Sequence, residues 1–584
     1  MKKQALPIVF AIAIIIISVV VIVIGNIIDK KTPSKKHISD RKMKELFLLM
    51  DGYTEDEDGI NFENAKEAKE NQIAIILQNQ LVKDRAVVID GIVYLKYEFV
   101  KEQINDKFYW DKNENYLLYT TPTDIIKTSV GSNDYFVSKI KNTEGYQIVK
   151  AEGNDTYIAI DFVKKYSDIE YTFNENPNRL RITNVWGGTV DTAVLKKDVA
   201  IRTDKNIKAD IIHMCAGDTN ADILDTGKKW SKVITENGFF GYVENKDLSK
   251  KNTKTLTSTF VYPEYTSIGR SDTISLAWNL VTSKAANENL VDLVTPAKGL
   301  NVVSPTWYRL SDNEGNMTSL VSENYVTRAH MLGLDVWAMV DDQSSDSDNK
   351  QIFTYTSKRE KLINQLVADA INYEIDGINI DFEYISSDIA DDYIQFMREL
   401  SVKCRINGIV LSVDLKVPEP SNAYYNPKAL GEVVDYVIIM GYDEHWGSDS
   451  GSGSVASLPW VTQGVADTVE IVDSKKVINA IPFYTRTWTE DAEGNVVEVS
   501  EDVMGVAEKK LANAGVTPVW VDNVGQNYGE YTSGENVVRV WLEDATSIEA
   551  KLKLISEYNL AGVAAWRLGY ETDEIWNTII KYTN

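Results

Sequence analysis

Short apolar segments alternate with amphipathic ones through the C-terminal half of this 584-residue chain, and this alternation constrains the fold most. Each apolar segment has the length of a buried strand, and helical spacing follows most of them, as in residues 355–375 and 391–409. The predicted strands lie at residues 274–281, 299–310, 334–340, 376–384, 409–415, 434–443, 476–484 and 561–569. Strands that alternate with helices pair in parallel, so eight of them within roughly 330 residues predict a (β/α)8 barrel.

One predicted strand, DGINIDFEY at residues 376–384, carries unusual polarity on one face. Because side chains alternate along a strand, Asn379, Asp381 and Glu383 point one way, into the barrel and toward its C-terminal rim. A buried row of acids costs stability through desolvation and repulsion, so a functional role is favoured over a solvated surface. Crowded carboxylates raise one another's pKa, which suits one of them to be a general acid. Aligned carboxylates that hold Mg²⁺ or Ca²⁺ are a minor alternative.

The same stretch resembles the DxxDxDxE signature of glycoside hydrolase family 18, which contains chitinases, endo-N-acetylglucosaminidases and peptidoglycan-cutting relatives. Asp376 and Asp381 match the first and last Asp of the signature, and Glu383 matches its proton donor. Asn379 stands where most members have the middle Asp. A neutral amide there can hydrogen-bond Asp381 but cannot share a proton, which predicts activity with an altered pH profile.

Three further strand ends agree with this resemblance, which extends over residues 257–584. The matching residues are Met440, Tyr442 and Asp443 in MGYDEHW, Tyr484 and Arg486 in IPFYTRTW, and Trp566 in AAWRLGYE. In the family, the last of these positions forms the aromatic floor of the sugar site. The resemblance thus implies supporting roles for Met440 and Asp443, together with Asp376 and Asn379, and substrate contacts for Tyr484, Arg486 and Trp566.

The resemblance also implies a substrate-assisted mechanism, an exception to the two-carboxylate scheme of most glycosidases. Glu383 would protonate the glycosidic oxygen while the 2-acetamido oxygen of the sugar attacks its own anomeric carbon. Asp381 would steady the resulting oxazolinium cation, and Tyr442 would hold the acetamido carbonyl. The substrate would then be a glycan with an N-acetylhexosamine at the cleaved bond, and the configuration would be retained.

Aromatic residues near strand ends could stack on sugar faces, although core packing is the alternative for each. They are Trp278, Trp307, Tyr308, Trp337, Trp446 and Trp488, of which we count Trp278 as substrate-binding beside Trp566. A small α+β insertion is expected at about residues 489–539. Its Trp520, Tyr528 and Tyr531 could form a cleft wall, but the insertion's own core is the default interpretation.

The N-terminal region is organised differently. An apolar run ending at Ile28 is long enough to cross a bilayer, and we expect an uncleaved anchor over residues 1–28 rather than a cleaved signal peptide. Lysines on both sides of the run leave its orientation open. A polar stalk follows at residues 29–51.

Residues 52–186 contain a duplicated unit, because Tyr94, Phe99 and Leu117 recur at one constant offset as Tyr157, Phe162 and Leu180. Each copy predicts a strand, a short helix and a hairpin, and resembles the N-terminal module of copper amine oxidases. Residues 190–250 resemble a bacterial SH3-type domain, a small β-barrel. Barrel core is the expected role of its Trp230 or Tyr242, and a groove for wall peptide or glycan is the alternative.

The composition of the chain limits the kinds of partner and cofactor that we expect. The formal net charge of −25 disfavours nucleic acid. Cys215 and Cys404 lie far apart without metal spacing, and the chain has four histidines, so we expect no disulfide framework, metal or cofactor. The oligomeric state stays open.

These observations favour a membrane-anchored glycosidase of the bacterial envelope with an extracellular catalytic domain, or a secreted one if the anchor is cleaved. Peptidoglycan is the favoured substrate and a chitin-type polymer the second. One alternative is a catalytically silent glycan-binding or chitin-binding protein, but lectin-like relatives usually lose the proton donor, which this chain keeps as Glu383. Another is a purely structural tether to the wall, which would leave the acid row unexplained.

Overall fold

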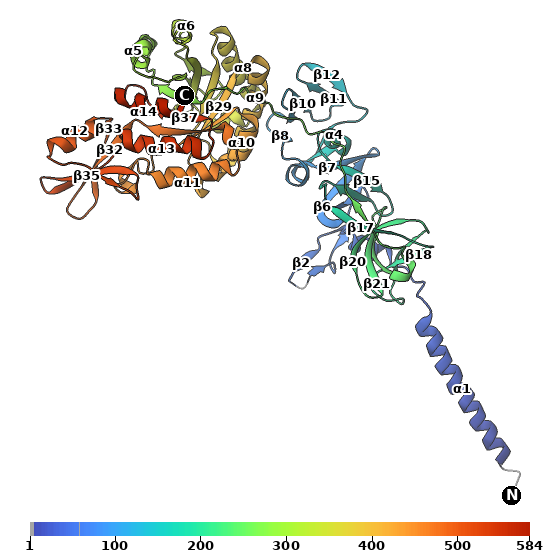
Figure 1. Ribbon diagram of the computed structural model, residues 1–584. Coiled ribbons are helices and arrows are strands. Elements are labelled where there is room, and N and C mark those ends of the chain that lie inside the picture. The colour runs from blue at the N-terminus through green and yellow to red at the C-terminus, as the bar shows by residue number, and fades with distance from the viewer. Residues whose placement is uncertain (1–4, 58, 584) are drawn as a thin grey trace. The chain divides into compact units, whose positions relative to one another are not determined.

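A computed structural model of the protein describes residues 5–57 and 59–583. The first four residues of the predicted anchor and the last residue of the predicted barrel domain lie outside the described residues. The chain divides into two compact units (Figure 1). The first comprises residues 1–108, 128–134 and 142–262, and the second comprises residues 109–127, 135–141 and 263–584.

The second unit is built on a closed barrel of eight parallel strands within the part of the chain that the structure describes. In pairing order they are β24 (Ile274–Asn279), β25 (Val302–Leu310), β27 (Asp335–Asp341), β28 (Gly377–Asp381), β29 (Val410–Lys416), β30 (Tyr436–Met440), β31 (Val477–Pro482) and β37 (Gly562–Trp566). The barrel closes where β37 pairs with β24, and β26 (Met317–Ser319) extends β25. The predicted (β/α)8 barrel is therefore confirmed.

Helices cover the outside of the barrel, as their amphipathic spacing predicts (Figure 1). They are α5 (Leu290–Val294), α6 (Glu323–Met331), α7 (Asn349–Phe353), α8 (Thr356–Asn372), α9 (Ala390–Asn407), α10 (Pro427–Val433), α11 (Leu458–Val469), α13 (Ala545–Glu557) and α14 (Asp573–Thr583). Helix α9 ends at Gly408, whose φ of 70° is the left-handed conformation that glycine adopts without strain. The chain can therefore turn there directly into β29.

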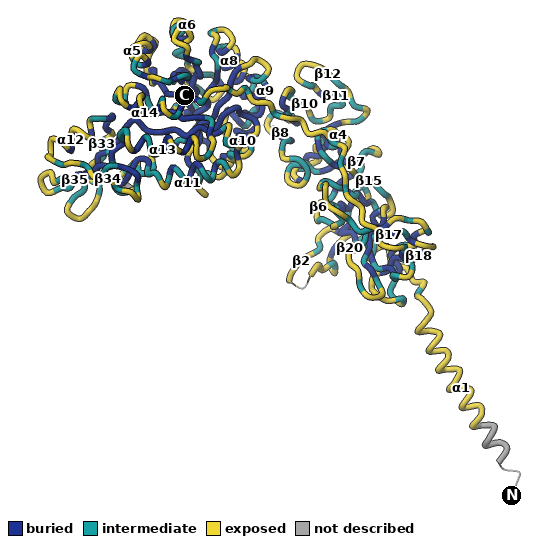
Figure 2. The backbone as a smooth tube through the Cα atoms, viewed as in Figure 1, coloured by how far each residue is buried: buried dark blue, intermediate teal, exposed yellow. Residues whose placement is uncertain are grey.

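The barrel holds an inner and an outer apolar layer. Figure 2 shows the interior of this domain in dark blue, the colour of buried residues. Trp278, Trp337, Tyr436, Ile438 and Ile478 belong to the inner layer. The outer layer joins the opposite strand faces to the helices. Both strand faces are thus buried, which explains the nearly continuous apolar runs of the sequence.

An insertion between β31 and β37 forms a sheet with the order β33-β32-β36-β35-β34. Its elements are β32 (Tyr484–Glu490), β33 (Val496–Val503), α12 (Val506–Asn513), β34 (Val519–Val521), β35 (Gln526–Ser533) and β36 (Asn536–Leu542). Tyr531 packs on the insertion's own core, and Tyr528 stacks near Trp541 at a ring distance of 4.9 Å. The insertion thus starts at Tyr484, so Tyr484 and Arg486 lie on its first strand.

A hairpin of the first repeat also belongs to the barrel unit. It consists of β8 (Tyr109–Asp111) and β9 (Tyr116–Thr120), and the sheet continues through β10 (Ile125–Ser129), β11 (Asp134–Val137) and β12 (Ile140–Thr143). Asp111 on β8 is buried and accepts hydrogen bonds from the backbone N–H of Thr356 (2.7 Å) and from its Oγ1 (2.6 Å). The hairpin therefore supplies the cap at the N-terminus of α8.

The first unit contains a sheet with the order β13-β14-β7-β6-β5-β16-β15. Its strands are β5 (Gln72–Leu77), β6 (Gln80–Ile89), β7 (Ile92–Lys96), β13 (Val149–Glu152), β14 (Asp155–Ala159), β15 (Glu170–Asn174) and β16 (Arg179–Thr183). The short helices α3 (Tyr97–Phe99) and α4 (Ile160–Lys165) follow the equivalent strands β7 and β14, which pair with each other. The hairpin of the second copy stays in this sheet, unlike that of the first. Before this sheet lie α2 (Asp40–Leu46) and the short strands β1 (Met50–Asp51), β2 (Thr54–Asp56), β3 (Gly59–Asn61) and β4 (Lys66–Glu67).

A second sheet of this unit has the order β19-β18-β22-β21-β20-β17-β23. Its strands are β17 (Thr189–Val194), β18 (Val199–Arg202), β19 (Ile211–Cys215), β20 (Asn220–Thr226), β21 (Trp230–Thr235), β22 (Phe240–Glu244) and β23 (Asn252–Thr255). Val233 and Val243 are fully buried, whereas Trp230 and Tyr242 are half-buried. The core role expected for at least one of these two aromatics therefore falls to the valines.

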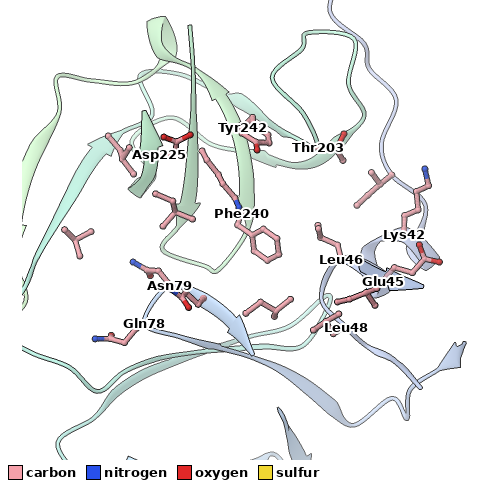
Figure 3. A pocket seen from close by; sticks show the side chains of 18 of the residues that line it. Lys42, Glu45, Leu46, Leu48, Gln78, Asn79, Thr203, Asp225, Phe240 and Tyr242 are labelled. Atoms are coloured by element: carbon pink, nitrogen blue, oxygen red, sulfur yellow. The ribbon is translucent and has the colours of Figure 1, made fainter. Parts of the chain in front are cut away.

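A cavity of about 1310 Å³ lies in the first unit, beside this second sheet. Figure 3 shows Asp225, Phe240 and Tyr242 on one side of it and Gln78 and Asn79 on the other. Its lining mixes apolar, amide and charged side chains. That an SH3-type groove binds wall peptide or glycan stays a prediction.

Helix α1 (Ala5–Lys31) precedes these domains. Its segment Ile12–Lys31 has a mean hydropathy of 2.8 and no buried residues, and it is long and apolar enough to cross a membrane. A signal sequence near the N-terminus has the same properties. The helix is thus compatible with the predicted anchor.

Candidate active site

A cavity of about 190 Å³ opens at the C-terminal ends of the barrel strands, where active sites of this fold lie. Strand ends and the insertion both contribute to its lining, which is Trp278, Met339, Gln343, Asp381, Glu383, Asp414, Met440, Tyr442, Asp443, Tyr484, Glu501 and Trp566. The structure thereby brings together Asp381, Glu383 and Tyr442, the predicted catalytic residues. It also places the predicted contacts Trp278, Met440, Asp443, Tyr484 and Trp566 around them.

Asn379 is fully buried below this cavity and uses both ends of its amide. Its Nδ2 donates to Oδ1 of Asp414 (2.7 Å) and Oγ of Ser412 (3.0 Å). Its Oδ1 accepts from Nε1 of Trp278 (2.9 Å) and Oγ of Ser304 (3.3 Å). The expected bond from Asn379 to Asp381 is not among them. An amide suits this position because it can donate and accept at once without adding charge.

Asp381 ends β28 and is 5% exposed. Burial raises its pKa well above the usual value, and the negative charges of Asp414 and Glu383 raise it further. Within the described residues, no hydrogen-bond donor reaches its buried Oδ1. A buried acceptor that lines the cavity without a partner is suited to receive an N–H from a ligand.

Asp414 on β29 is a site residue that our sequence analysis missed. It is buried beside Asp381, and burial raises its pKa well above the usual value. The hydrogen bond from Asn379 opposes this rise, while the charge of Glu383 adds to it. The signal was available, because Ser412 and Asp414 alternate with apolar residues in LSVDL just as the acids do in DGINIDFEY.

Glu383 lies just beyond β28 and is half-buried at the rim of the cavity. Its backbone N–H donates to Oδ1 of Asp342 (3.0 Å), and that of Tyr384 donates to Oδ2 (2.9 Å). Asp342 is buried, which raises its pKa, and it also was not predicted. It fixes the main chain that carries Glu383 and leaves the Glu383 side chain free to turn toward the cavity.

The Glu383 carboxylate has two polar neighbours. Oε1 accepts a hydrogen bond from Nε2 of Gln343 (3.3 Å), and Oε2 lies 3.2 Å from Nζ of Lys416. Neither neighbour was predicted from the sequence.

The insertion contributes one wall. Tyr484 donates to Oδ1 of Asp443 (2.5 Å), and burial together with the Asp443 charge raises the pKa of Tyr484 well above its usual value. Arg486 also pairs with Asp443 (2.5 Å) and lies 3.7 Å from Glu501. Arg486 is therefore engaged with carboxylates instead of facing the cavity. Burial also raises the pKa of Tyr442, whose ring lies 6.3 Å from that of Tyr484.

The aromatic candidates separate into three groups. Trp566 and Trp278 line the cavity with ring centroids 5.9 Å apart, and the peptide bond after Trp566 is cis. Trp278 is itself only 1% exposed, so it belongs to the inner core layer as well. Trp307, Tyr308, Trp337 and Trp488 are at most 2% exposed and do not line the cavity, and Trp446 is 69% exposed. Strand-end position alone could not separate these three cases.

Asp376 is not brought to the cavity. It precedes β28 at the opposite end of the barrel, where its Oδ2 accepts from the backbone N–H of Val336 and lies 2.8 Å from Nε2 of His330. Its contacts stabilise the loop that enters β28. A direct role at the cleaved bond is therefore not supported by its position.

The barrel carries a rim glutamate beside buried aspartates and the indole rings of Trp278 and Trp566, an arrangement that fits a glycosidase. Residues 310–571, which contain the barrel from the end of β25 onward, match the family model "Glycosyl hydrolases family 18". Residues 76–182 match the "Copper amine oxidase N-terminal domain". These two resemblances noted from the sequence are thereby confirmed, and the SH3-type resemblance of residues 190–250 stays a prediction.

Three proteins illustrate what the chain is similar to. The chain is 25% identical over 301 residues to the uncharacterized glycosylase YvbX of Bacillus subtilis, which covers 49% of this chain and 85% of that protein. It is 28% identical over 244 residues to the cortical fragment-lytic enzyme of Bacillus subtilis, covering 40% and 55%. The chain thus spans about half the length of that enzyme. The crystal structure of the Bacillus megaterium spore cortex-lytic enzyme SleL matches at 19% identity and a TM-score of 0.48, covering 56% of this chain and 77% of that one.

Proposed function

We propose that the barrel hydrolyses β-linked, N-acetylglucosamine-containing glycan of the cell wall and retains the anomeric configuration. The observation that carries this proposal is the unpartnered, buried Oδ1 of Asp381 beside the rim acid Glu383. An acetamido N–H is a donor of the right kind for that oxygen. Its 2-acetamido group would then lie in the cavity above the Trp566 floor.

The residues of the site would act in sequence. Glu383 donates its proton to the glycosidic oxygen, while the acetamido oxygen attacks the anomeric carbon and expels the leaving sugar. Asp381 accepts the acetamido N–H and stabilises the positive oxazolinium. Tyr442 donates to the acetamido oxygen and orients it. Glu383 then takes a proton from the incoming water, which opens the intermediate and restores the acid.

Two observations support peptidoglycan before chitin. The relatives include enzymes named for lysis of the spore cortex, and the copper-amine-oxidase-type module together with the SH3-type fold predicted for residues 190–250 is typical of wall-associated proteins. The apolar helix α1 and these relatives fit an envelope or secreted protein. We infer further that the helix is retained as an anchor with the barrel outside the cell.

The test is a digest of purified peptidoglycan and of chitin oligomers by the full-length protein in detergent. Glu383→Gln should lower turnover by about 100- to 10,000-fold, the usual contribution of a general acid. New reducing-end N-acetylglucosamine, quantified by mass spectrometry after borohydride reduction, is the readout.

The matched control is Glu493→Gln, the same change on an exposed turn of the insertion. It should leave turnover unchanged. Equal product from Glu383→Gln and the wild type would remove Glu383 as the acid. If the wild type binds the glycans but releases no product, the protein is a glycan-binding one.

A further inference from the structure

Lys416 occupies a specific place beside the rim acid. It is the last residue of β29, on the same strand face as Ser412 and Asp414, and the strand register sets it opposite Met440. Its side chain is 56% exposed, and Nζ lies 3.2 Å from Oε2 of Glu383. The inward polar row of β29 thus ends in a cation at the mouth of the cleft.

Two other cations near the rim pair with carboxylates of their own. Arg309 forms two hydrogen bonds with Asp341 (2.6 and 3.0 Å), and Arg486 pairs with Asp443. Among the residues that the structure describes, Glu383 is the carboxylate with which Lys416 pairs. Lys416 is therefore the rim cation whose carboxylate partner is the general acid itself.

A general acid must come within hydrogen-bonding distance of the leaving oxygen. Nζ of Lys416 lies 3.2 Å from Oε2 of Glu383, so it also lies close to the leaving sugar. The cleft itself is lined by carboxylates, including Asp381, Asp414 and Glu501, so an anionic substrate would need a cation at this position.

The position of Glu383 limits which substituents of the substrate Lys416 can reach. Glu383 protonates the oxygen on C4 of the leaving sugar, so a neighbouring cation lies close to the substituent on C3 or to the neutral hydroxymethyl group on C5 of the same sugar. In N-acetylmuramic acid the C3 oxygen carries a lactyl group with a carboxyl, whereas in chitin it is a neutral hydroxyl.

We propose that Lys416 is a specificity-determining residue that binds a carboxylate on the C3 substituent of the leaving sugar. This inference rests on the proposed function and sharpens it. The bond cleaved is the one from N-acetylglucosamine to N-acetylmuramic acid. The carboxylate belongs either to a free lactyl group or to the attached stem peptide.

The experiment measures the preference for anionic over neutral glycan as a ratio of kcat/KM values. The substrates are peptide-free glycan strands with a free lactyl carboxyl, the same strands with that carboxyl converted to a methylamide, and muropeptides with intact stem peptides. Lys416→Met should reduce the preference of the full-length protein for carboxylate over methylamide by about 10- to 100-fold, as expected for a hydrogen bond to a charged group. Lys416→Arg should restore part of it. A preference that appears with muropeptides alone assigns the carboxylate to the stem peptide.

The control is Lys350→Met, because Lys350 has a similarly exposed side chain (58%) and pairs with Asp388 instead of with the acid. It should leave the ratio unchanged. The inference is overturned if Lys416→Met leaves both this ratio and the preference for muropeptides unchanged.

Binding separates this inference from the proposed function. Calorimetry on the wild type compares the Kd values of the free-carboxyl and methylamide strands without requiring turnover. A preference that depends on Lys416 in the absence of hydrolysis supports the subsite and contradicts the enzyme. Hydrolysis without any such preference supports the enzyme and contradicts the subsite.

Discussion

At the scale of single residues, Asn379 sets the charge beneath the cleft. Its amide joins Asp414 to Trp278 without adding a third buried carboxylate. In Asn379→Asp, the ionised form of the new carboxyl adds negative charge near Asp381 and raises its already elevated pKa. A carboxyl with a higher pKa becomes ionised only at a higher pH. We therefore expect the acid limb of the kcat/KM profile, which requires ionised Asp381, to move to higher pH.

The control for this prediction is Asn279→Asp, the same change at a buried residue whose Nδ2 bonds Oη of Tyr325. This variant should lower the free energy of unfolding without moving the acid limb of the kcat/KM profile. An unchanged profile in Asn379→Asp would show that this position does not control the charge of the site.

At the scale of elements, the hairpin β8–β9 stabilises the barrel although it comes from the first repeat. Asp111 caps α8, whose own N-cap residue Tyr355 makes no side-chain cap bond. Asp111→Ala leaves buried donors of Thr356 without an acceptor and should cost about 1–3 kcal/mol of unfolding free energy. Urea unfolding followed by tryptophan fluorescence measures it.

A second cap on the same hairpin provides the comparison. Glu114 accepts from the backbone N–H of Ser357 (2.7 Å) at an exposed site, so Glu114→Ala should cost at most about 1 kcal/mol. Equal losses of unfolding free energy in the two variants would mean that the burial of Asp111 does not contribute to the stability of the barrel.

At the scale of the whole molecule, the proposed role of α1 as a membrane anchor can be tested directly. The full-length protein should float with phospholipid vesicles in a density gradient, and a chain without residues 1–31 should not. Ile17→Lys places a charge in the apolar run at a cost of about 2.5–3.5 kcal/mol and should reduce flotation. Asp392→Asn, far from the helix in sequence, is the control. Mass spectrometry of the membrane-bound protein from cells decides between an anchor, which keeps the N-terminus, and a cleaved signal sequence.

Local patterns in the sequence were sufficient for the barrel and for the acid row. Strand segments can be recognised from their composition and their hydrophobic period. The alternation in DGINIDFEY places Asp381 and Glu383 on one strand face, and this inference needs no other strand. Tyr442 and Trp566 were predicted differently, through the resemblance of MGYDEHW and AAWRLGYE to the family's strand ends, and both line the cavity.

Tertiary structure alone decided which residues complete the site. Asn379 meets Asp414, and Glu383 meets Lys416, because strand register aligns neighbours more than thirty residues apart in the chain. Asp342 holds the main chain of Glu383 in the same way. Side-chain periodicity specifies a face of one strand, but the partner opposite that face depends on how the barrel closes. For that reason the acid row could be predicted from the sequence, whereas the pairing of Asn379 with Asp414 and of Glu383 with Lys416 could not.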